Sequence, residues 1–253
     1  MKLILLAVLL QGPQSIYHVS AAVDIPVTVG AGLVLAVPNF YADRLIKPRC
    51  PCDPNEVNAF DRGAIGNKST TAATLSDVTV GVVILAPLVF DAVDLGGFNQ
   101  AWWEDAVVFG QALAINGALV TAAKYIAQRP LPRTYAGDPS LIDKPEGYRS
   151  FYSGHTSNAF AALSATAMTI RLRYGEKTWP WIVTGVIGTS VAVERVAAGR
   201  HFPTDVIAGA VMGTAVGIVV PWLHSRERGA GGGGPQASQG PGGGVVLGWQ
   251  LRF

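Results

Sequence analysis

Six stretches of the chain carry no charged residue, and polar segments separate them: residues 25–42, 78–90, 106–123, 156–170, 178–193 and 206–224. A helix needs about 20 mainly apolar residues to cross a bilayer, so the shorter stretches must extend into their polar flanks. The second stretch is flanked by Asp77 and Asp91. One of these must lie near an interface or turn toward the protein interior. The pattern predicts an all-α integral membrane bundle of about six helices.

Small residues recur within two of these stretches. Gly209, Gly213 and Gly217 are four residues apart, so they lie on one helical face, where a neighbouring helix can approach closely. Gly185 and Gly188 predict a similar contact in the fifth stretch. We therefore expect closely packed helices.

The composition agrees with a membrane environment. Of the residues, 49% are hydrophobic and only 14% are charged, which favours a bilayer over water. The formal net charge is +2, and no basic stripe with interleaved aromatics is present, which argues against a nucleic-acid partner. The alternative is the helical core of a soluble domain.

The two ends of the chain differ from its middle. A basic start, an apolar run at residues 3–10 and small residues before position 23 predict a signal peptide or signal anchor over residues 1–22, followed by a membrane domain over 23–228. Residues 229–244 are rich in glycine and predict a flexible tail, and the alternation in 245–253 predicts one short strand. Cys50 and Cys52 are too few for a structural zinc site or a disulfide scaffold, so they are free thiols or a local pair.

Ionisable residues gather where the apolar stretches meet, at 124–133, 153–155 and 195–205. In an alternating bundle these three segments share one membrane face. Lysine, arginine, histidine and aspartate side chains that converge near an interface form an anion site with acid and base groups supplied.

In the third segment, Arg195 is followed after five residues by His201, and His201 after three residues by Asp205. A helix that begins near Pro203 places His201 and Asp205 on one side. A carboxylate on one ring nitrogen fixes the tautomer and leaves the other nitrogen as a nucleophile. Arg195 is the expected phosphate ligand, because its planar fork matches phosphate oxygens.

In the second segment, Ser153 and Gly154 precede His155 at the expected start of a helix. Helix N-termini bind anions, so the backbone N–H groups of Ser153 and Gly154 are expected to contact phosphate oxygens. His155 is the candidate general acid. Lys124 and Arg129 add positive charge where a transition state gathers negative charge.

Each of these residues also has a purely structural interpretation. A single histidine near a helix end is more often a cap than a catalyst. Lys124, Arg129 and Arg133 can serve as interfacial anchors that flank a membrane helix. The spacing of Arg195, His201 and Asp205 is more specific, and its combination with Ser-Gly-His favours catalysis.

These motifs resemble those of the type 2 phosphatidic acid phosphatases, which share a fold and site with vanadium haloperoxidases and bacterial acid phosphatases. The family motifs are Lys-x6-Arg-Pro, Pro-Ser-Gly-His and Ser-Arg-x5-His-x3-Asp, and the resemblance covers roughly residues 124–205. Tyr152 replaces the usual proline, Glu194 the usual serine, and Leu131 the usual arginine before Pro132. Arg129, or else Arg133, is expected to supply the missing guanidinium.

The resemblance implies a lipid phosphate or pyrophosphate phosphatase that works without a metal or other cofactor. His201 would form a phosphohistidine, Asp205 would orient it and His155 would act as the acid, while phosphate would be held by Lys124, Ser153, Gly154 and Arg195. The alternatives are a soluble acid phosphatase, a vanadate-dependent haloperoxidase or a non-catalytic membrane protein. The oligomeric state is left open.

Basic residues also lie at the end of the bundle opposite the motifs: Arg171, Arg173, Lys177, Arg226 and Arg228. Short basic loops prefer the cytoplasm. A multi-pass protein of a bacterial-type inner membrane is therefore expected, with its active site facing the periplasm or exterior.

Overall fold

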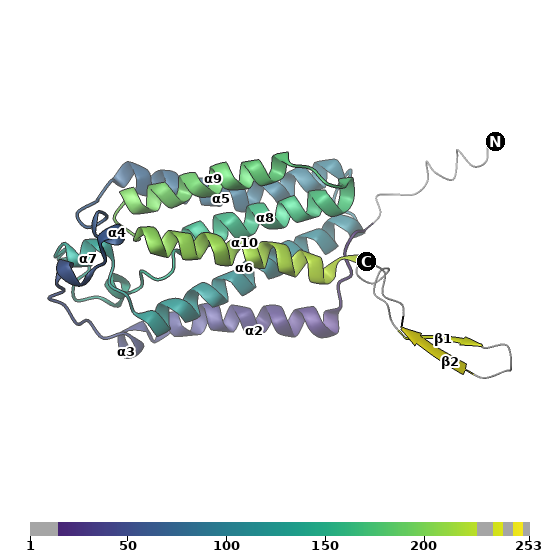
Figure 1. The fold of residues 1–253 in the computed structure, drawn as a ribbon, viewed down its shortest axis with the longest axis horizontal. Helices are drawn as coiled ribbons and strands as arrows, with labels where there is room; N and C mark the ends of the chain where they lie inside the picture. The colour runs from purple at the N-terminus through teal and green to yellow at the C-terminus, as the bar shows by residue number, and fades with distance from the viewer. Residues whose placement is uncertain (1–14, 227–234, 240–244, 250–253) are drawn as a thin grey trace.

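The computed structural model describes residues 15–226, 235–239 and 245–249. Six long helices lie side by side and alternate in direction (Figure 1). They are α2 (Ala21–Phe40), α5 (Thr70–Asp94), α6 (Gln100–Ala127), α8 (Gly154–Tyr174), α9 (Trp179–Ala197) and α10 (Pro203–His224). Each contains most of one apolar stretch, which confirms the predicted helical membrane bundle.

Most of these helices are longer than the apolar stretches, because the charged residues they take in are paired. In α5 and α6, Asp91 and Asp105 both contact Arg173 of α8, with 2.7 Å between Asp91 Oδ1 and Arg173 Nη1. At the start of α5, Asp77 contacts Arg195 of α9. An unpaired charge inside a membrane is costly, so this pairing allows the helices to continue past their apolar segments.

The central helix is α8, which packs against α5, α6, α9 and α10. Its contact with α10 follows the predicted glycine face. A Cβ atom on Gly213 would lie 2.2 Å from the carbonyl oxygen of Ser157, and one on Gly217 would lie 2.4 Å from that of Ala161. Gly209 has a similarly close neighbour, so the prediction for this glycine face is confirmed.

The glycines of α9 behave differently from each other. A Cβ atom on Gly188 would lie 2.6 Å from the ring of Phe160 on α8. No atom lies within 4 Å of the position that a Cβ atom on Gly185 would take. The prediction for Gly185 was therefore wrong, because only Gly188 faces α8.

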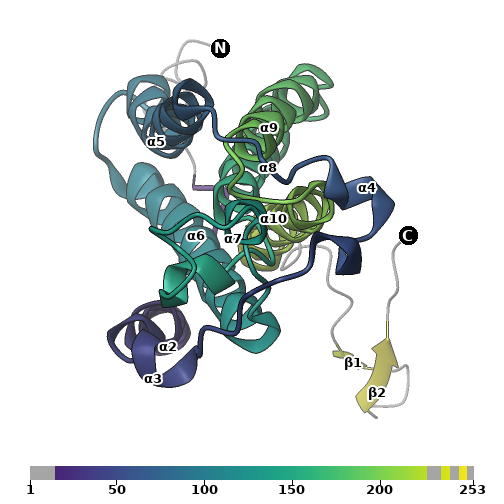
Figure 2. The ribbon, with the colours of Figure 1, turned by 90° about the vertical axis from the view of Figure 1, so that its left-hand side faces the viewer.

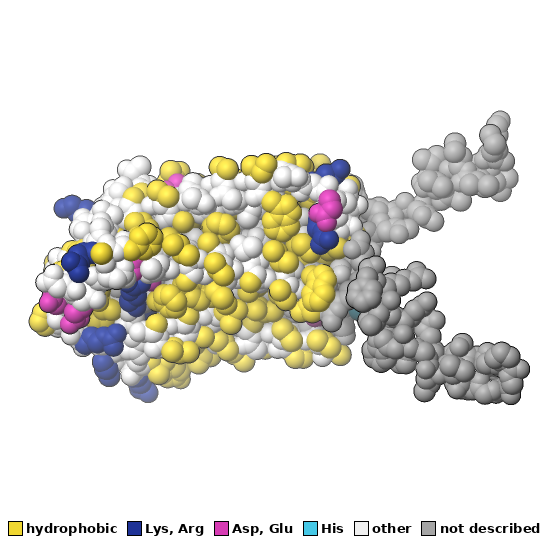
Figure 3. Space-filling model, in the orientation of Figure 1, with side chains coloured by type: hydrophobic (Ala, Val, Ile, Leu, Met, Phe, Trp, Pro, Cys, Tyr) yellow, Lys and Arg dark blue, Asp and Glu magenta, His cyan; other side chains and the backbone are white. Residues whose placement is uncertain are grey.

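Hydrophobic side chains cover the middle of the face shown in Figure 3, and charged side chains gather toward its ends. Among the described residues, four segments are long and apolar enough to cross a membrane: Ala21–Phe40, Thr70–Asp94, Gln100–Tyr135 and Pro203–His224. Large apolar side chains such as Phe90 and Ile126 are exposed. A surface of this kind fits lipid rather than water, which disfavours the soluble-domain alternative.

Short elements connect the helices at the end that carries the motifs. They are α3 (Ala42–Leu45), η1 (Pro54–Glu56), α4 (Ala59–Arg62), α7 (Pro132–Tyr135) and η2 (Pro145–Tyr148). Cys50 and Cys52 form a disulfide. Of the two alternatives, free thiols or a local pair, the structure therefore shows the local pair. Gly199 has a φ of +65°, and a Cβ atom there would lie 1.9 Å from the carbonyl oxygen of Asn67. Glycine is thus required where the segment before His201 lies against the loop before α5.

At the opposite end, Tyr17 is buried against α6 and α10, and its hydroxyl lies 2.9 Å from that of Thr169. Cleavage after residue 22 would remove Tyr17 from this core. The signal-peptide interpretation stays a prediction. Residues 1–14 lie outside the described part. In the tail, β1 (Pro235–Gln239) pairs antiparallel with β2 (Val245–Trp249). The predicted strand is present over 245–249 and has a partner in the segment predicted to be flexible, while residues 250–253 lie outside the described part.

Candidate active site

The predicted site residues lie at one end of the bundle, which faces the viewer in Figure 2. Helices α6 and α9 end there, and α5, α8 and α10 begin there. This arrangement follows from the alternating direction of the helices, and it brings together residues far apart in the sequence, such as Asp77 and Arg195, which are 118 positions apart.

His201 lies just before the start of α10 and is only 3% exposed. Its Nδ1 is 2.8 Å from the carbonyl oxygen of Ser150. A carbonyl only accepts, so Nδ1 carries the proton and Nε2 keeps its lone pair. Burial lowers the pKa of His201 well below its ordinary value, and the nearby positive charges of Lys124 and Arg195 lower it further. The imidazole is therefore neutral and has the tautomer of a nucleophile.

Asp205 acts on His201 less directly than the spacing predicts. Its Oδ2 is 3.9 Å from Nδ1 of His201, which is too long for a hydrogen bond. It accepts instead from the hydroxyl of Ser150 at 2.5 Å and from the backbone N–H of Phe202 at 2.9 Å. Because the carbonyl oxygen of Ser150 accepts a hydrogen bond from Nδ1 of His201, Asp205 holds the residue that orients the imidazole.

Arg129 is committed to carboxylates in the described part of the chain. Its Nη1 is 2.6 Å from Asp205 Oδ1, and its Nη2 is 2.7 Å from Asp61 Oδ2. Its guanidinium also lies over the ring of Phe202, 4.1 Å from the centroid. This geometry differs from the expected phosphate contact, because two fully buried carboxylates compete for the same guanidinium.

Asp61 comes from α4, in the long loop after the first membrane helix. It accepts from the N–H and the hydroxyl of Thr204 at 2.9 Å and 2.6 Å. Burial alone would raise the pKa of Asp61, but hydrogen bonds from Arg129 and Thr204 outweigh it and lower the pKa. The loop is thus tied to the first turn of α10 by an ionised carboxylate.

A second carboxylate reaches the site from α5. Asp77 Oδ1 is 2.8 Å from Nε2 of His155 and 3.1 Å from Nη1 of Arg195. Ser76 contacts the same Nη1 atom at 3.1 Å. The Nε atom of Arg195 is buried and has no hydrogen-bond partner among the described residues. One side of the guanidinium is thus held by α5, and a buried donor remains for an anion.

Ser153 caps α8 and is fully buried. Its backbone N–H donates to the carbonyl oxygen of Asp205 at 3.1 Å, so this donor is occupied, contrary to the simple expectation of a phosphate contact. Gly154 follows as the first residue of α8. A Cβ atom there would lie 3.2 Å from Val120 of α6, which explains why a small residue is required where the two helices meet.

Two further positions belong to the first motif. Arg133 pairs with Asp138 in the loop after α7, and Leu131 is buried. Arg133 also lies beside Gly199, since a Cβ atom on that glycine would be 2.9 Å from Arg133 Cγ; its expected role as the missing guanidinium stays a prediction. Sequence reasoning missed Asp61 and identified Asp77 only as a charge beside an apolar stretch. The requirement that a membrane-embedded carboxylate find a partner was the signal that could have connected Asp77 to the site.

The fold and site together define a class: a helical membrane bundle with a histidine-centred anion site at one end. Residues 105–228 match the family model described as the PAP2 superfamily. Over this segment, which is just under half of the chain, the protein is similar to the members of that superfamily.

Three curated relatives show the same similarity. The chain is 29% identical to a lipid A 1-phosphatase of Porphyromonas gingivalis, over 59% of this chain and 30% of the relative. It is 30% identical to an undecaprenyl-diphosphatase of Sulfolobus acidocaldarius, over 41% of this chain and 47% of the relative. It is 27% identical to a probable diacylglycerol pyrophosphate phosphatase 1 of Schizosaccharomyces pombe, over 52% of this chain and 59% of the relative. The matches thus span between about a third and three fifths of these relatives.

Two solved structures are also similar. The crystal structure of Aquifex aeolicus LpxE shares 25% identity with a TM-score of 0.46, over 65% of this chain and 96% of that one. A transmembrane PAP2-type phosphatidylglycerolphosphate phosphatase from Bacillus subtilis shares 20% identity with a TM-score of 0.49, over 79% of this chain and 94% of that one.

Proposed function

We propose that this protein is a phosphatase that hydrolyses a lipid phosphate or lipid pyrophosphate through a phosphohistidine on His201. The observation that carries the proposal is the neutral, buried imidazole of His201, whose Nδ1 proton is held by Ser150 and which lies beside Lys124 and Arg195. A nucleophile surrounded by fixed positive charge suits attack on an anionic phosphorus centre. The relatives named as lipid phosphatases support the same reaction class.

The proposed reaction has two steps. Nε2 of His201 attacks phosphorus and forms a P–N bond while the bond to the leaving oxygen breaks, and His155 gives its proton to that oxygen. Water then attacks the phosphohistidine, His155 takes a proton from the water, and phosphate leaves as the P–N bond breaks. Asp77 stabilises the protonated form of His155 before the first transfer and after the second, because its carboxylate lies 2.8 Å from Nε2. Arg195 and Lys124 stabilise the charge on the phosphoryl oxygens.

The reaction is expected to need no metal ion. Lys124 and Arg195 beside the nucleophile would repel a divalent cation and already supply the charge that such an ion would provide.

The test is phosphate release by the detergent-solubilised full chain from a panel of lipid phosphates and pyrophosphates, with EDTA present. We expect release by the wild type, none by His201→Ala, and a ³²P-labelled, acid-labile protein adduct in a rapid quench. Release that persists in His201→Ala would refute the proposed nucleophile. Absence of release from every substrate by folded protein would favour the non-catalytic alternative.

We further propose that the catalytic end faces the periplasm or exterior of a bacterial-type inner membrane. Arg171, Lys177 and Arg226 lie at the other end, as the basic-loop rule requires for the cytoplasm, although Arg173 is turned inward to carboxylates. Lys144 and Lys177 are both exposed, at opposite ends. An impermeant amine reagent on intact cells should label Lys144 and spare Lys177; the reverse pattern would invert the topology.

A further inference from the structure

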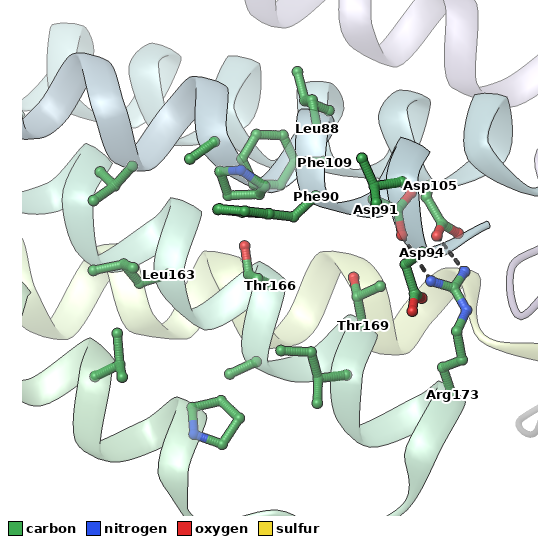
Figure 4. A pocket seen from close by; sticks show the side chains of 18 of the residues that line it. Leu88, Phe90, Asp91, Asp94, Asp105, Phe109, Leu163, Thr166, Thr169 and Arg173 are labelled. Carbon is green, nitrogen blue, oxygen red and sulfur yellow. Dashed lines mark hydrogen bonds and ion pairs between the residues drawn. The ribbon is translucent and has the colours of Figure 1, made fainter. Parts of the chain in front are cut away.

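A cavity of about 730 Å³ lies between α5, α6, α8 and α9 (Figure 4). Its wall is mainly apolar and includes Leu88, Phe90, Phe109 and Leu163. Pockets of this size accommodate small molecules or parts of larger ones.

The same four helices carry catalytic-end residues at their other ends: Asp77, Lys124, His155 and Arg195. The cavity therefore lies along the bundle axis from the proposed site, toward the opposite membrane face.

The depth of the cavity can be measured along α8. Leu163, at the near wall, is eight residues beyond His155, which corresponds to about 12 Å at 1.5 Å per residue. Arg173, at the far end, is 18 residues beyond His155, or about 27 Å. One leaflet of hydrocarbon is about 15 Å thick, half of the ~30 Å core. The cavity thus begins near the middle of the membrane and extends through the leaflet opposite the site.

The cavity opens sideways into the bilayer. Val82, Phe90 and Val93 line it and are also more than half exposed. Toward the catalytic end it is closed by a packed cluster that includes Phe109, Leu163 and buried residues of α8 and α9. A hydrocarbon chain that extends from the site to this cavity would therefore run along the lipid-facing side of α5 and α6. It would enter the cavity from the side.

The far end of the cavity is polar and negative. Arg173 pairs with Asp91 and Asp105, and Asp94 receives a hydrogen bond from Tyr174. Three carboxylates thus face one guanidinium among the lining residues. The anionic phosphate of a phospholipid from the opposite leaflet would be repelled here, whereas an uncharged chain end in the apolar part would not.

From this placement we propose that the cavity receives the distal end of the substrate's hydrocarbon chain. If the phosphate of the substrate lies at His201 and the end of its hydrocarbon chain lies in this cavity, that hydrocarbon chain must pass the middle of the bilayer. Long-chain isoprenoid phosphates and diphosphates have this property. The proposal rests on the proposed phosphatase function and narrows its substrate class, with the charged far end setting the chain-length limit.

The first experiment fills the cavity. Thr166 lines it on α8 (Figure 4), and Thr166→Phe places a ring in its interior. Thr189→Phe is the matched control, because Thr189 is exposed on α9 and is not among the lining residues. The readout is kcat/KM on a C55 polyprenyl phosphate, a C16 diacylglycerol phosphate and a soluble phosphate ester, with thermal unfolding measured alongside.

We expect Thr166→Phe to lower kcat/KM on the C55 substrate about tenfold or more, the scale of a lost apolar pocket contact, and to leave the other two within about twofold. Thr189→Phe should change none of them. An equal loss on all three substrates, or no loss on the C55 phosphate, would overturn the proposal. A wild type silent on every substrate would instead count against the phosphatase function.

The second experiment does not depend on turnover or on the variant's folding. A long-chain isoprenoid phosphate with a diazirine at its chain terminus is photolysed with the wild-type protein in a bilayer nanodisc. Labelling of cavity residues such as Leu163 or Thr166, suppressed by inorganic vanadate competing at the phosphate site, supports the proposal. Labelling confined to the outer surface of the bundle overturns it. Labelling of the cavity by a terminally modified phospholipid with equal efficiency also overturns it, since the cavity would then hold ordinary bilayer lipid.

Discussion

Asp77 is predicted to support His155 as the general acid, and Asp77→Asn tests this role while keeping the size of the side chain. Asp77 makes two charge-assisted contacts, at 2.8 Å to His155 and 3.1 Å to Arg195. A hydrogen bond to a charged group contributes roughly 1.5–3 kcal/mol. The Asp77 side chain is 60% exposed, so solvent reduces that value. We take about 1.5 kcal/mol, or approximately tenfold in rate.

The assay compares two substrates that differ in how much help the leaving oxygen needs. A lipid phosphate has a poor alkoxide leaving group and depends on protonation, whereas an aryl phosphate with an acidic phenol does not. Asp77→Asn should therefore lower kcat about tenfold on the lipid phosphate and less than about threefold on the aryl ester. Asp143→Asn is the control, because Asp143 is exposed and forms no ion pair among the described residues. Equal losses on both substrates, or no loss on either, would refute the role of Asp77 in proton transfer.

Three further predictions concern the framework of the site. Arg129→Lys should lower the unfolding temperature together with activity, because lysine cannot bridge two buried carboxylates; lost activity at an unchanged unfolding temperature would make Arg129 a phosphate ligand instead. Gly213→Leu should destabilise the bundle by more than about 3 kcal/mol through overpacking against α8, whereas Gly185→Leu, which meets open space, should be neutral in a thermal unfolding scan. The lowered pKa of His201 means that the fold disfavours its protonation, so stability should fall as the pH drops below about 6.5, the unfolded-state value; His201→Gln should remove this contribution, and identical pH profiles of unfolding would contradict it.

The arrangement of the bundle followed from the sequence because it depends on local patterns. Apolar stretches mark helices, and the alternation of helices places Lys124, His155 and Arg195 at one end without knowledge of any contact. The glycine face of α10 was likewise visible as a four-residue spacing, and Gly213 contacts Ser157 as that spacing requires. These features are set by period and order along the chain.

The charged contacts around the site could not be predicted in the same way. Asp61 comes from a loop 68 residues before Arg129, and nothing in the local sequence distinguishes it from other acidic loop residues. The contacts of Arg129 with Asp61 and Asp205 could not be predicted for the same reason, because they depend on the tertiary fold; its expected role at the phosphate stays a prediction. The extension of α5 and α8 into their polar flanks was expected, but the partners that allow it were not, such as Arg173 for Asp91.

The distribution of charge at the catalytic end has a consequence for catalysis. Asp61 and Asp205 both pair with Arg129, and Asp77 contacts His155 and Arg195. In the described part of the chain, Lys124 forms no ion pair, although it acts on His201 through its charge. The carboxylates are thus committed to the framework, and a cation beside the nucleophile is left without a counter-charge. An anion that enters this site meets donors that are already fixed and need not reorganise. The same arrangement favours an anion over a neutral ester at this site.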